Sequence, residues 1–229
     1  MTIADNLHTV MGRISAAAEG AGRAPLAVTL VVVTKTIDVE RIREAVAAGA
    51  AILGENRVQE AKEKIEHLGP LAPWHLIGHL QSNKAKYAVN LFDLIHSVDS
   101  IELAREIDRQ AAKIGKVQDV LVEVNIAGEK AKHGADRDAV LSLVREVAQL
   151  RNMAIKGLMT MPPFSDSPED SRPYFRHLRE LSDRVAQEQI PGVSMHELSM
   201  GMSGDYEVAI EEGATMVRVG TAIFGERTK

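Results

Sequence analysis

The sequence predicts one domain of the α/β class, a closed (β/α)8 TIM barrel with an extra helix at its N-terminus. About eight short apolar, largely β-branched runs alternate with segments of helical periodicity. Parallel strands need such crossovers, and eight of them in 229 residues suit a closed barrel better than an open doubly wound sheet, which remains the alternative. The composition, 45% hydrophobic and 26% charged, is typical of a globular protein. We therefore expect residues 1–229 to form a single domain.

The expected strands are bounded by turn-forming residues. They cover residues 29–35, 51–56, 74–80, 94–98, 120–126, 155–161, 197–200 and 216–219. Most are separated by a segment long enough for one helix. Each strand with its following helix is therefore expected to form one unit of the barrel.

The expected helices carry recognisable start and stop signals. They cover residues 3–20, 38–49, 99–115 and 135–150. Asp38 is an N-cap candidate and Gly49 suits the left-handed position after a helix. Asp99 with Glu102 resembles a capping box. Because the first helix precedes the first strand, it should pack outside the ring, and the Pro-rich residues 161–170 should form a long loop after the sixth strand.

Composition excludes several classes of function. The chain has 27 basic and 32 acidic residues without a basic block, so nucleic-acid binding is not expected. Neither a signal peptide nor an apolar run of about 20 residues is apparent, which favours the cytoplasm and no membrane association. The lack of cysteine excludes disulfides and thiolate chemistry. His75 and His79 have a helical zinc-ligand spacing, but their segment WHLIGHL is strand-like, so no metal site is expected.

The candidate site residues follow strands on one rim. Lys35 ends the first expected strand, Asn56 the second and Ser199 the seventh. Active sites of such barrels lie at this carboxyl rim. A single lysine there is usually solvated, but the preceding VVV run would lower its pKa and favour the neutral amine that attacks a carbonyl group. Lys35 is therefore a Schiff-base candidate.

Two small-residue loops follow the last two strands. They are LSMGMSGD at residues 198–205 and VRVGTAIFG at residues 217–225. Either loop alone could be a tight turn, but loops at these two places often bind phosphate together. Arg218 stands between their glycines and could contact a phosphate, a ring nitrogen or a structural acid.

These motifs resemble the pyridoxal phosphate homeostasis proteins, a family related to the N-terminal domain of alanine racemase. The matching segments are VTKT (33–36), GENRVQE (54–60), HLIGHLQSNK (75–84), VNIAGEKAKHG (124–134), GLMTM (157–161) and the two glycine loops. They run from the first strand to the last in order. One departure is Arg57, where the family more usually has tyrosine.

The resemblance implies a pyridoxal 5′-phosphate (PLP) site. Lys35 would form the internal aldimine and Arg218 would face the pyridine nitrogen. The phosphate would be held by Ser199, the Met200 backbone, Gly220 and Thr221. Asn56, Ile77 and Met159 would line the ring pocket.

The expected function is custody of PLP without catalysis, including delivery to PLP-dependent apoenzymes, by a monomeric protein. An unprotonated pyridine nitrogen beside Arg218 would weaken the ring as an electron sink. A second domain that would supply a racemase-type tyrosine is not expected. The first alternative is a monomeric PLP-dependent amino-acid racemase with Lys35 as one base, and the second is a cofactor-free lysine aldolase. The loop at residues 128–134, with Lys130, Lys132 and His133, is expected near the rim, either as a solvated loop or as a cofactor relay.

Overall fold

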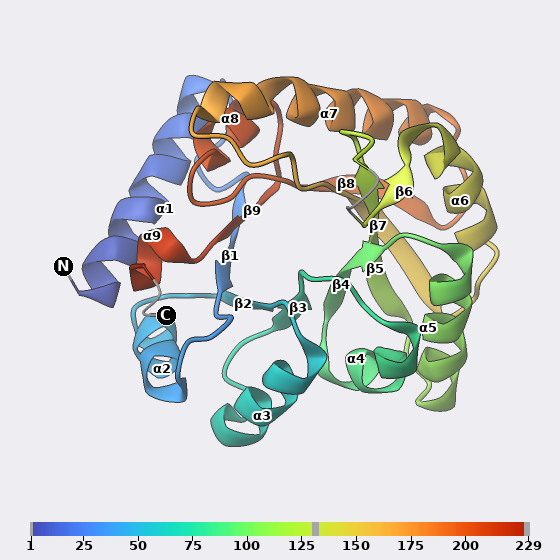
Figure 1. Cartoon of the computed structure of the whole chain (residues 1–229), viewed down its shortest axis with the longest axis horizontal. Helices are drawn as coiled ribbons and strands as arrows, with labels where there is room; N and C mark the ends of the chain where they lie inside the picture. Colours follow the sequence, from blue (N-terminus) through green and yellow to red (C-terminus); the bar gives the residue numbers. More distant parts are fainter. Residues whose placement is uncertain (1, 130–132, 227–229) are drawn as a thin grey trace.

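The computed structural model describes residues 2–129 and 133–226, and within them eight parallel strands close into a ring (Figure 1). These strands are β1 (Thr29–Val33), β2 (Ile52–Glu55), β3 (Trp74–Leu76), β4 (Leu94–Val98), β5 (Gln118–Asn125), β7 (Met153–Met159), β8 (Val193–Ser199) and β9 (Met216–Val219). Neighbours in the ring follow the chain order, and pairing of β1 with β9 closes it. The predicted (β/α)8 barrel is confirmed.

A short ninth strand lies outside this ring. Strand β6 (Ala135–Asp136) pairs in parallel with the end of β5, with Val124 opposite Ala135. The helix expected over 135–150 therefore begins later, as a 3-10 turn at Arg137–Ala139 followed by α6 (Val140–Val147). The expectation was wrong at its start because backbone pairing with β5 holds these two residues extended.

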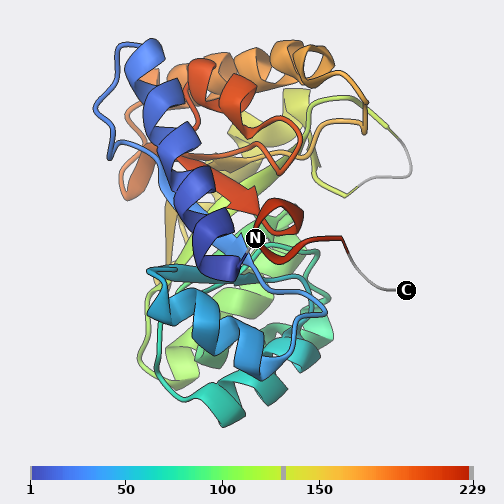
Figure 2. The same ribbon diagram turned by 90° about the vertical axis from the view of Figure 1, so that its left-hand side faces the viewer.

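The remaining helices surround the barrel. They are α1 (Ile3–Gly20), α2 (Val39–Ala47), α3 (Val58–Leu68), α4 (Ala85–Leu91), α5 (Ile101–Lys113), α7 (Arg172–Gln187), α8 (Tyr206–Glu211) and α9 (Thr221–Phe224), with 3-10 turns at Ser82–Lys84 and Pro168–Ser171. Helix α1 packs against α2, α8 and α9 on the outside of the ring, as predicted (Figure 2). Among the described residues, no helix has both the length and the apolar character needed to cross a membrane.

The capping predictions had mixed outcomes. The Asp38 side chain accepts a hydrogen bond of 2.9 Å from the Arg41 N–H, and Gly49 has a φ of 108°, so both signals for α2 are confirmed. The N-cap of α5 is Ser100, which accepts from the Leu103 N–H. The prediction of Asp99 as the cap was wrong by one residue, because α5 begins at Ile101 and Ser100 is therefore the residue directly before it. The Asp99 carboxylate is therefore available for other contacts.

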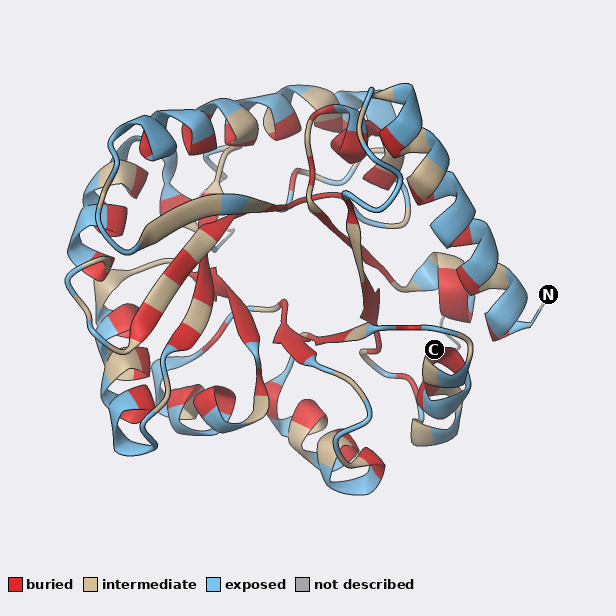
Figure 3. Cartoon of the chain, turned by 180° about the vertical axis from the view of Figure 1, so that it is seen from behind, coloured by how far each residue is buried: buried red, intermediate tan, exposed pale blue. Residues whose placement is uncertain are grey.

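The main hydrophobic core lies between the strands and the helices. Figure 3 shows buried residues on the helix faces that point toward the barrel and exposed residues on the outer faces. The barrel interior holds a smaller apolar cluster of Leu94, Leu121, Met159 and Met216. Polar side chains share that interior: a hydrogen bond joins His96 of β4 to Ser199 of β8, which are not neighbours in the ring. This polar interior lies beneath the rim at which the strands end.

Candidate functional site

A cavity of about 400 Å³ opens at the carboxyl ends of the strands. Six of the nine positions proposed from the sequence line it: Lys35, Asn56, Ile77, Arg218, Gly220 and Thr221. They come from the ends of β1, β2, β3 and β9. Segments far apart in the sequence are thus brought together at one mouth. Its volume lies in the range of small-molecule sites.

The other three proposed positions do not line this cavity. Met159 is fully buried in the apolar cluster inside the barrel. Ser199 is also fully buried and takes part in the polar interior. The Met200 backbone N–H donates to the Met216 carbonyl at 3.1 Å, so in this arrangement it is not available to an anion. Their direct roles toward a cofactor stay predictions.

The turn that carries Lys35 is held on both sides. Thr36, the next residue, has a φ of 64°, which is unfavourable for a β-branched side chain. Its N–H donates to Glu60 Oε1 at 2.5 Å, and the carbonyl of Thr34 accepts from Lys64 Nζ at 2.7 Å. Helix α3, which carries both Glu60 and Lys64, therefore fixes the backbone on either side of Lys35.

Lys64 gains its own position from a buried ion pair. Its ammonium lies 2.6 Å from Glu55 Oε1 and 2.6 Å from Glu60 Oε1, and Glu55 is fully buried. Burial raises the pKa of Glu55, while Lys64 and the Thr34 hydroxyl act against that shift. The GENRVQE motif thus contributes two carboxylates to the Lys35 turn. Sequence reasoning missed Lys64, and its partial signal was the i, i+4 spacing from Glu60 on the same helix.

The β2 and β3 loops form one wall of the cavity. Gly78 leaves no room for a side chain, because a Cβ there would lie 2.4 Å from the Asn56 carbonyl oxygen. The Asn56 Oδ1 atom is buried and has no hydrogen-bond partner among the described residues. A buried amide oxygen of this kind is costly unless a ligand or water satisfies it. The wall therefore offers a polar contact to a bound molecule. The neighbouring Arg57 is exposed and makes no capping hydrogen bond at the start of α3.

The two glycine loops meet at another part of the cavity. Ser203 and Gly220 both line it, and the Ser203 Oγ lies 3.4 Å from the backbone nitrogens of Gly220 and Ala222. Gly201 has a φ of 91°, and a Cβ there would approach Ala209 to 2.6 Å. Glycine at 201 therefore lets this loop pack closely against α8, and the long hydrogen bonds to Ser203 leave the N–H groups of Gly220 and Ala222 open to an anion. Ser203 belongs to the same LSMGMSGD motif as the predicted Ser199, and it is Ser203 that lines the cavity.

A buried polar chain supports Arg218. Its guanidinium donates to Ser199 Oγ at 2.6 Å and to the Thr160 carbonyl at 3.0 Å. Ser199 Oγ also lies 2.9 Å from His96 Nδ1, and His96 Nε2 lies 3.0 Å from His75 Nδ1. Burial lowers the pKa of His75 to about 4 and that of His96 well below its usual value, so both rings are neutral at pH 7. Burial lowers the pKa of Arg218 only to about 10, and it stays charged.

A second cavity of about 330 Å³ adjoins the first. Both are lined by Met161, Phe164 and Met202. Glu123 and His133 also line the second, which places His133 near the rim as predicted. Lys130 and Lys132 lie outside the described residues.

Glu123 is the most perturbed acid of the mouth. It is 3% exposed, and its Oε2 has no partner among the described residues. Burial and the nearby charge of Asp99 raise its pKa to about 7, while Arg218 acts in the opposite direction. No sequence pattern indicated this, because an acid in an alternating strand is usually exposed.

No tyrosine lines either mouth cavity. Tyr87 is exposed on α4, and Tyr206 is buried under the guanidinium of Arg13, which lies 5.5 Å from its ring centre. Tyr174 lies in α7. The described residues therefore bring no tyrosine to the cavity that contains Lys35.

Known proteins resemble this chain in both sequence and fold. A model of the alanine racemase N-terminal domain family matches residues 8–228. A pyridoxal phosphate homeostasis protein of Aquifex aeolicus is 48% identical over 228 residues, covering 99% of each chain. The structure of PipY from Synechococcus elongatus with PLP bound has a TM-score of 0.85 at 38% identity, and the match covers 98% of this chain and 100% of that one. An alanine racemase of Clostridium difficile, at 18% identity and a TM-score of 0.76, shares the fold over 98% of this chain and 58% of its own.

Proposed function

The chain belongs to the pyridoxal phosphate homeostasis protein family, and on that premise we propose that it binds PLP in the 400 Å³ cavity, with Lys35 as the covalent anchor. One observation carries the proposal: Lys35, Arg218 and both glycine loops line a single cavity. A relative 38% identical over its whole length has been solved with PLP bound. The protein thereby serves PLP homeostasis by holding the cofactor.

The residues of the cavity fit this group. PLP supplies an aldehyde that condenses with amines and a pyridine ring that accepts electrons. Lys35 provides the amine, and the loops with Ser203, Gly220 and Thr221 provide hydroxyl and backbone donors for a phosphate. The unpartnered Oδ1 of Asn56 provides an acceptor in the wall. Each polar part of the cofactor thus has a protein group of suitable chemistry in the same cavity.

The positive charge of Arg218 favours binding of PLP without catalysis. In our proposal its guanidinium faces the ring nitrogen. Because it stays protonated at pH 7 and only donates hydrogen bonds, it keeps that nitrogen without a proton. A ring in this state is a weak electron sink. Arg218 is fixed by Ser199 and Thr160, so it has little freedom to turn away.

The alternative is a PLP-dependent amino-acid racemase, which the match to the alanine racemase N-terminal domain favours. Racemisation needs a proton donor or acceptor on each face of the bound substrate. Lys35 could serve one face. Among the described residues, no tyrosine lines the cavity to serve the other face. The acid that lines it, Asp205, accepts hydrogen bonds from the Ser171 hydroxyl and the Met202 N–H, and Glu123 lines the adjoining cavity. This arrangement makes holding the cofactor the better supported function.

Borohydride trapping tests the site. The full-length protein is incubated with PLP, reduced, digested and analysed by mass spectrometry, and the pyridoxyl group is expected on Lys35. Lys35→Ala should lose the adduct, while Lys86→Ala, at an exposed helix position, should keep it. An adduct on another lysine would overturn the proposal. A protein that stays colourless after incubation with PLP would also overturn it, because a cofactor-free lysine aldolase would behave in that way.

A racemase assay separates custody from catalysis. The PLP-loaded protein should leave L-alanine unchanged over hours. Equilibration of L- and D-alanine that is abolished in Lys35→Ala would instead establish the enzyme. The same proposal includes three further properties: the protein is a monomer, it is located in the cytoplasm, and it delivers PLP to apoenzymes. Delivery is tested by mixing the PLP-loaded protein with an aminotransferase from which PLP has been removed, in the presence of a scavenger of free PLP. Recovery of aminotransferase activity under these conditions is expected if the protein transfers PLP directly.

A further inference from the structure

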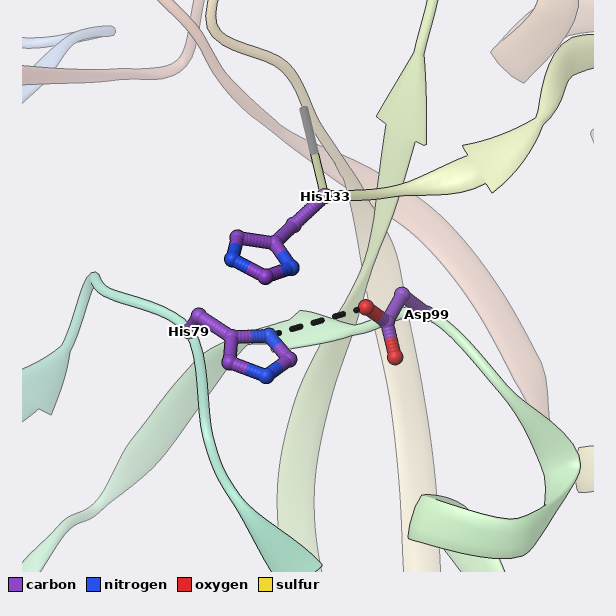
Figure 4. Close-up of side chains that lie close together, drawn as sticks. All are labelled: His79, Asp99 and His133. Carbon is purple, nitrogen blue, oxygen red and sulfur yellow. Dashed lines mark ion pairs between the residues drawn. The ribbon is translucent and has the colours of Figure 1, made fainter. Parts of the chain in front are cut away.

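Three potential metal ligands converge beside the mouth. His79, Asp99 and His133 follow β3, β4 and β5, three consecutive strands of the ring (Figure 4). Their nearest ligand atoms all lie within 4.8 Å of one another. None of the three lines the 400 Å³ cavity. The group is therefore separate from the residues assigned to PLP.

The distance between His79 and Asp99 is informative. Nδ1 of His79 lies 3.7 Å from Oδ2 of Asp99, which is too long for a hydrogen bond. Tetrahedral zinc with Zn–N and Zn–O bonds of about 2.1 Å separates two of its ligand atoms by about 3.4 Å. The distance between His79 and Asp99 is thus already close to the spacing that one bound ion would impose. Only the ligand atoms that lie farther apart, at up to 4.8 Å, need to approach one another.

The two histidine rings can complete such a site by rotation. His79 and His133 are stacked, with centroids 3.7 Å apart and planes 9° apart. An imidazole lone pair lies in the plane of its ring, so stacked rings hold their lone pairs in separate, nearly parallel planes, and binding of one ion requires the rings to turn until the lone pairs converge. This change uses χ2, a torsion with a broad range of accessible values. Both rings are partly solvent-accessible, which leaves a path for an ion.

Asp99, within the group, and the nearby Glu123 are two acidic side chains that favour a cation. The buried Glu123, whose Oε2 has no partner among the described residues, lines the 330 Å³ cavity together with His133. Asp99 raises the pKa of Glu123, so the two acids repel each other when both are ionised. A divalent ion between the histidines and Asp99 would offset this repulsion. Because His133 lines the 330 Å³ cavity, an ion bound by His133 would lie beside that cavity.

We propose that His79, Asp99 and His133 bind one divalent transition-metal ion, with Zn²⁺ the best match to two imidazoles and a carboxylate. Three protein ligands leave a fourth position for water or for a group bound in the 330 Å³ cavity. The sequence did not suggest this site, because the helical spacing pairs His79 with His75. In the fold, His75 is buried and lies 3.0 Å from His96 in the polar chain. The metal site does not depend on PLP binding.

Calorimetric titration with ZnCl₂ tests the proposal on the full-length protein after dialysis against EDTA. One ion per chain is expected. His79→Gln, Asp99→Asn and His133→Gln should each raise the zinc dissociation constant at least tenfold, since each removes one of three ligands. His8→Gln, an exposed histidine of α1, should leave it unchanged. Circular dichroism verifies that the variants, all altered near the surface, are folded.

Cobalt substitution gives a second readout. Co²⁺ should produce intense d–d bands in the wild type and in His8→Gln, because a low-symmetry site of side-chain ligands strengthens these bands. They should disappear in the His79→Gln, His133→Gln double variant. A wild type that takes up no zinc, or a folded double variant that binds zinc as tightly as the wild type, overturns the proposal.

Discussion

The ammonium of Lys64 donates a hydrogen bond of 2.7 Å to the backbone carbonyl of Thr34, the residue immediately before Lys35. The same ammonium contacts Glu60, which accepts from the N–H of Thr36, immediately after Lys35. One helix thus fixes both ends of a strained turn. Lys35, the proposed anchor of the cofactor, thus owes its position to two residues that lie outside the cavity, Glu60 and Lys64, which were not among the site residues predicted from the sequence.

Removal of this clamp should impair both folding and PLP attachment. Lys64→Met leaves Glu55 buried without its cation, and breaking such a pair typically costs about 3–5 kcal/mol. Urea unfolding should show this loss, and the loaded fraction at limiting PLP should fall. Lys62→Met removes an exposed ion pair with Glu66 and a contact with the exposed Tyr87 ring, and it should change stability by only about 1 kcal/mol. Equal behaviour of the two variants would contradict the clamp.

Gly78→Ala tests the wall between the β2 and β3 loops. A Cβ at Gly78 would meet the Asn56 backbone at 2.4 Å, so the loops must separate. We expect destabilisation of about 1–3 kcal/mol and weaker PLP retention as Asn56 moves. Gly12→Ala serves as the control, because a Cβ in that helix meets nothing within 4 Å and should stabilise it by up to about 1 kcal/mol. Thermal melting and equilibrium dialysis give the two measurements.

The raised pKa of Glu123 predicts that the stability of the fold depends on pH. Its pKa is raised to about 7 from 4.5, so between these values the folded chain holds a proton that the unfolded chain has lost. Stability from this group is full below pH 4.5 and declines as the pH rises toward 7.

Glu123→Gln should remove this decline. At pH 8 the variant should be more stable than the wild type by on the order of 2 kcal/mol, since each tenfold change in proton affinity between the folded and unfolded chain is worth about 1.4 kcal/mol. Near pH 4.5 the difference should disappear. Urea unfolding in EDTA across this range measures it, with the exposed Glu44→Gln as a control that shows no such trend. A constant difference at every pH would disprove the assignment.

Thr221→Val should mainly weaken PLP binding, whereas Ser199→Ala should mainly lower the stability of the fold. Thr221 lines the cavity, and loss of a hydrogen bond to a charged phosphate, worth about 1.5–3 kcal/mol, should weaken PLP retention at least tenfold with little effect on folding. Ser199 contacts Arg218 and His96 inside the barrel, so its removal should mainly lower stability. Thr9→Val on α1 should change neither. Dialysis against PLP-free buffer and urea unfolding separate the two effects; an unaltered retention in Thr221→Val would contradict the cradle.

Much of the fold could be predicted because its signals are local. The β-branched runs and the apolar periodicity of α1 lie within single elements, so they needed no knowledge of the rest of the chain. Two errors arose where long-range pairing decides. The pairing of Ala135 with Val124 turned a helix start into a strand. Asp99 lost the cap to Ser100 and instead lies 3.7 Å from His79.

The residues that line the cavity could be predicted where they belong to recognisable motifs. Lys35, Arg218 and the glycine loops were recognisable, and they line one cavity. Lys64 and Glu123 were missed because each looks like an ordinary charged residue of a helix or a strand. Their importance comes from burial and from partners that the sequence does not place beside them.

The sequence alone determined the alternation of strand and helix, and with it the barrel and the rim that carries Lys35. These follow from backbone preferences and apolar periodicity, which act between residues near each other in the chain. Tertiary structure decided which groups are buried and what they face: the Lys64 clamp, the polar chain from Arg218 to His75 and the meeting of His79 with His133. The reason is that electrostatic and hydrogen-bond energies depend on distance and solvent exposure in space, which only the closed ring establishes.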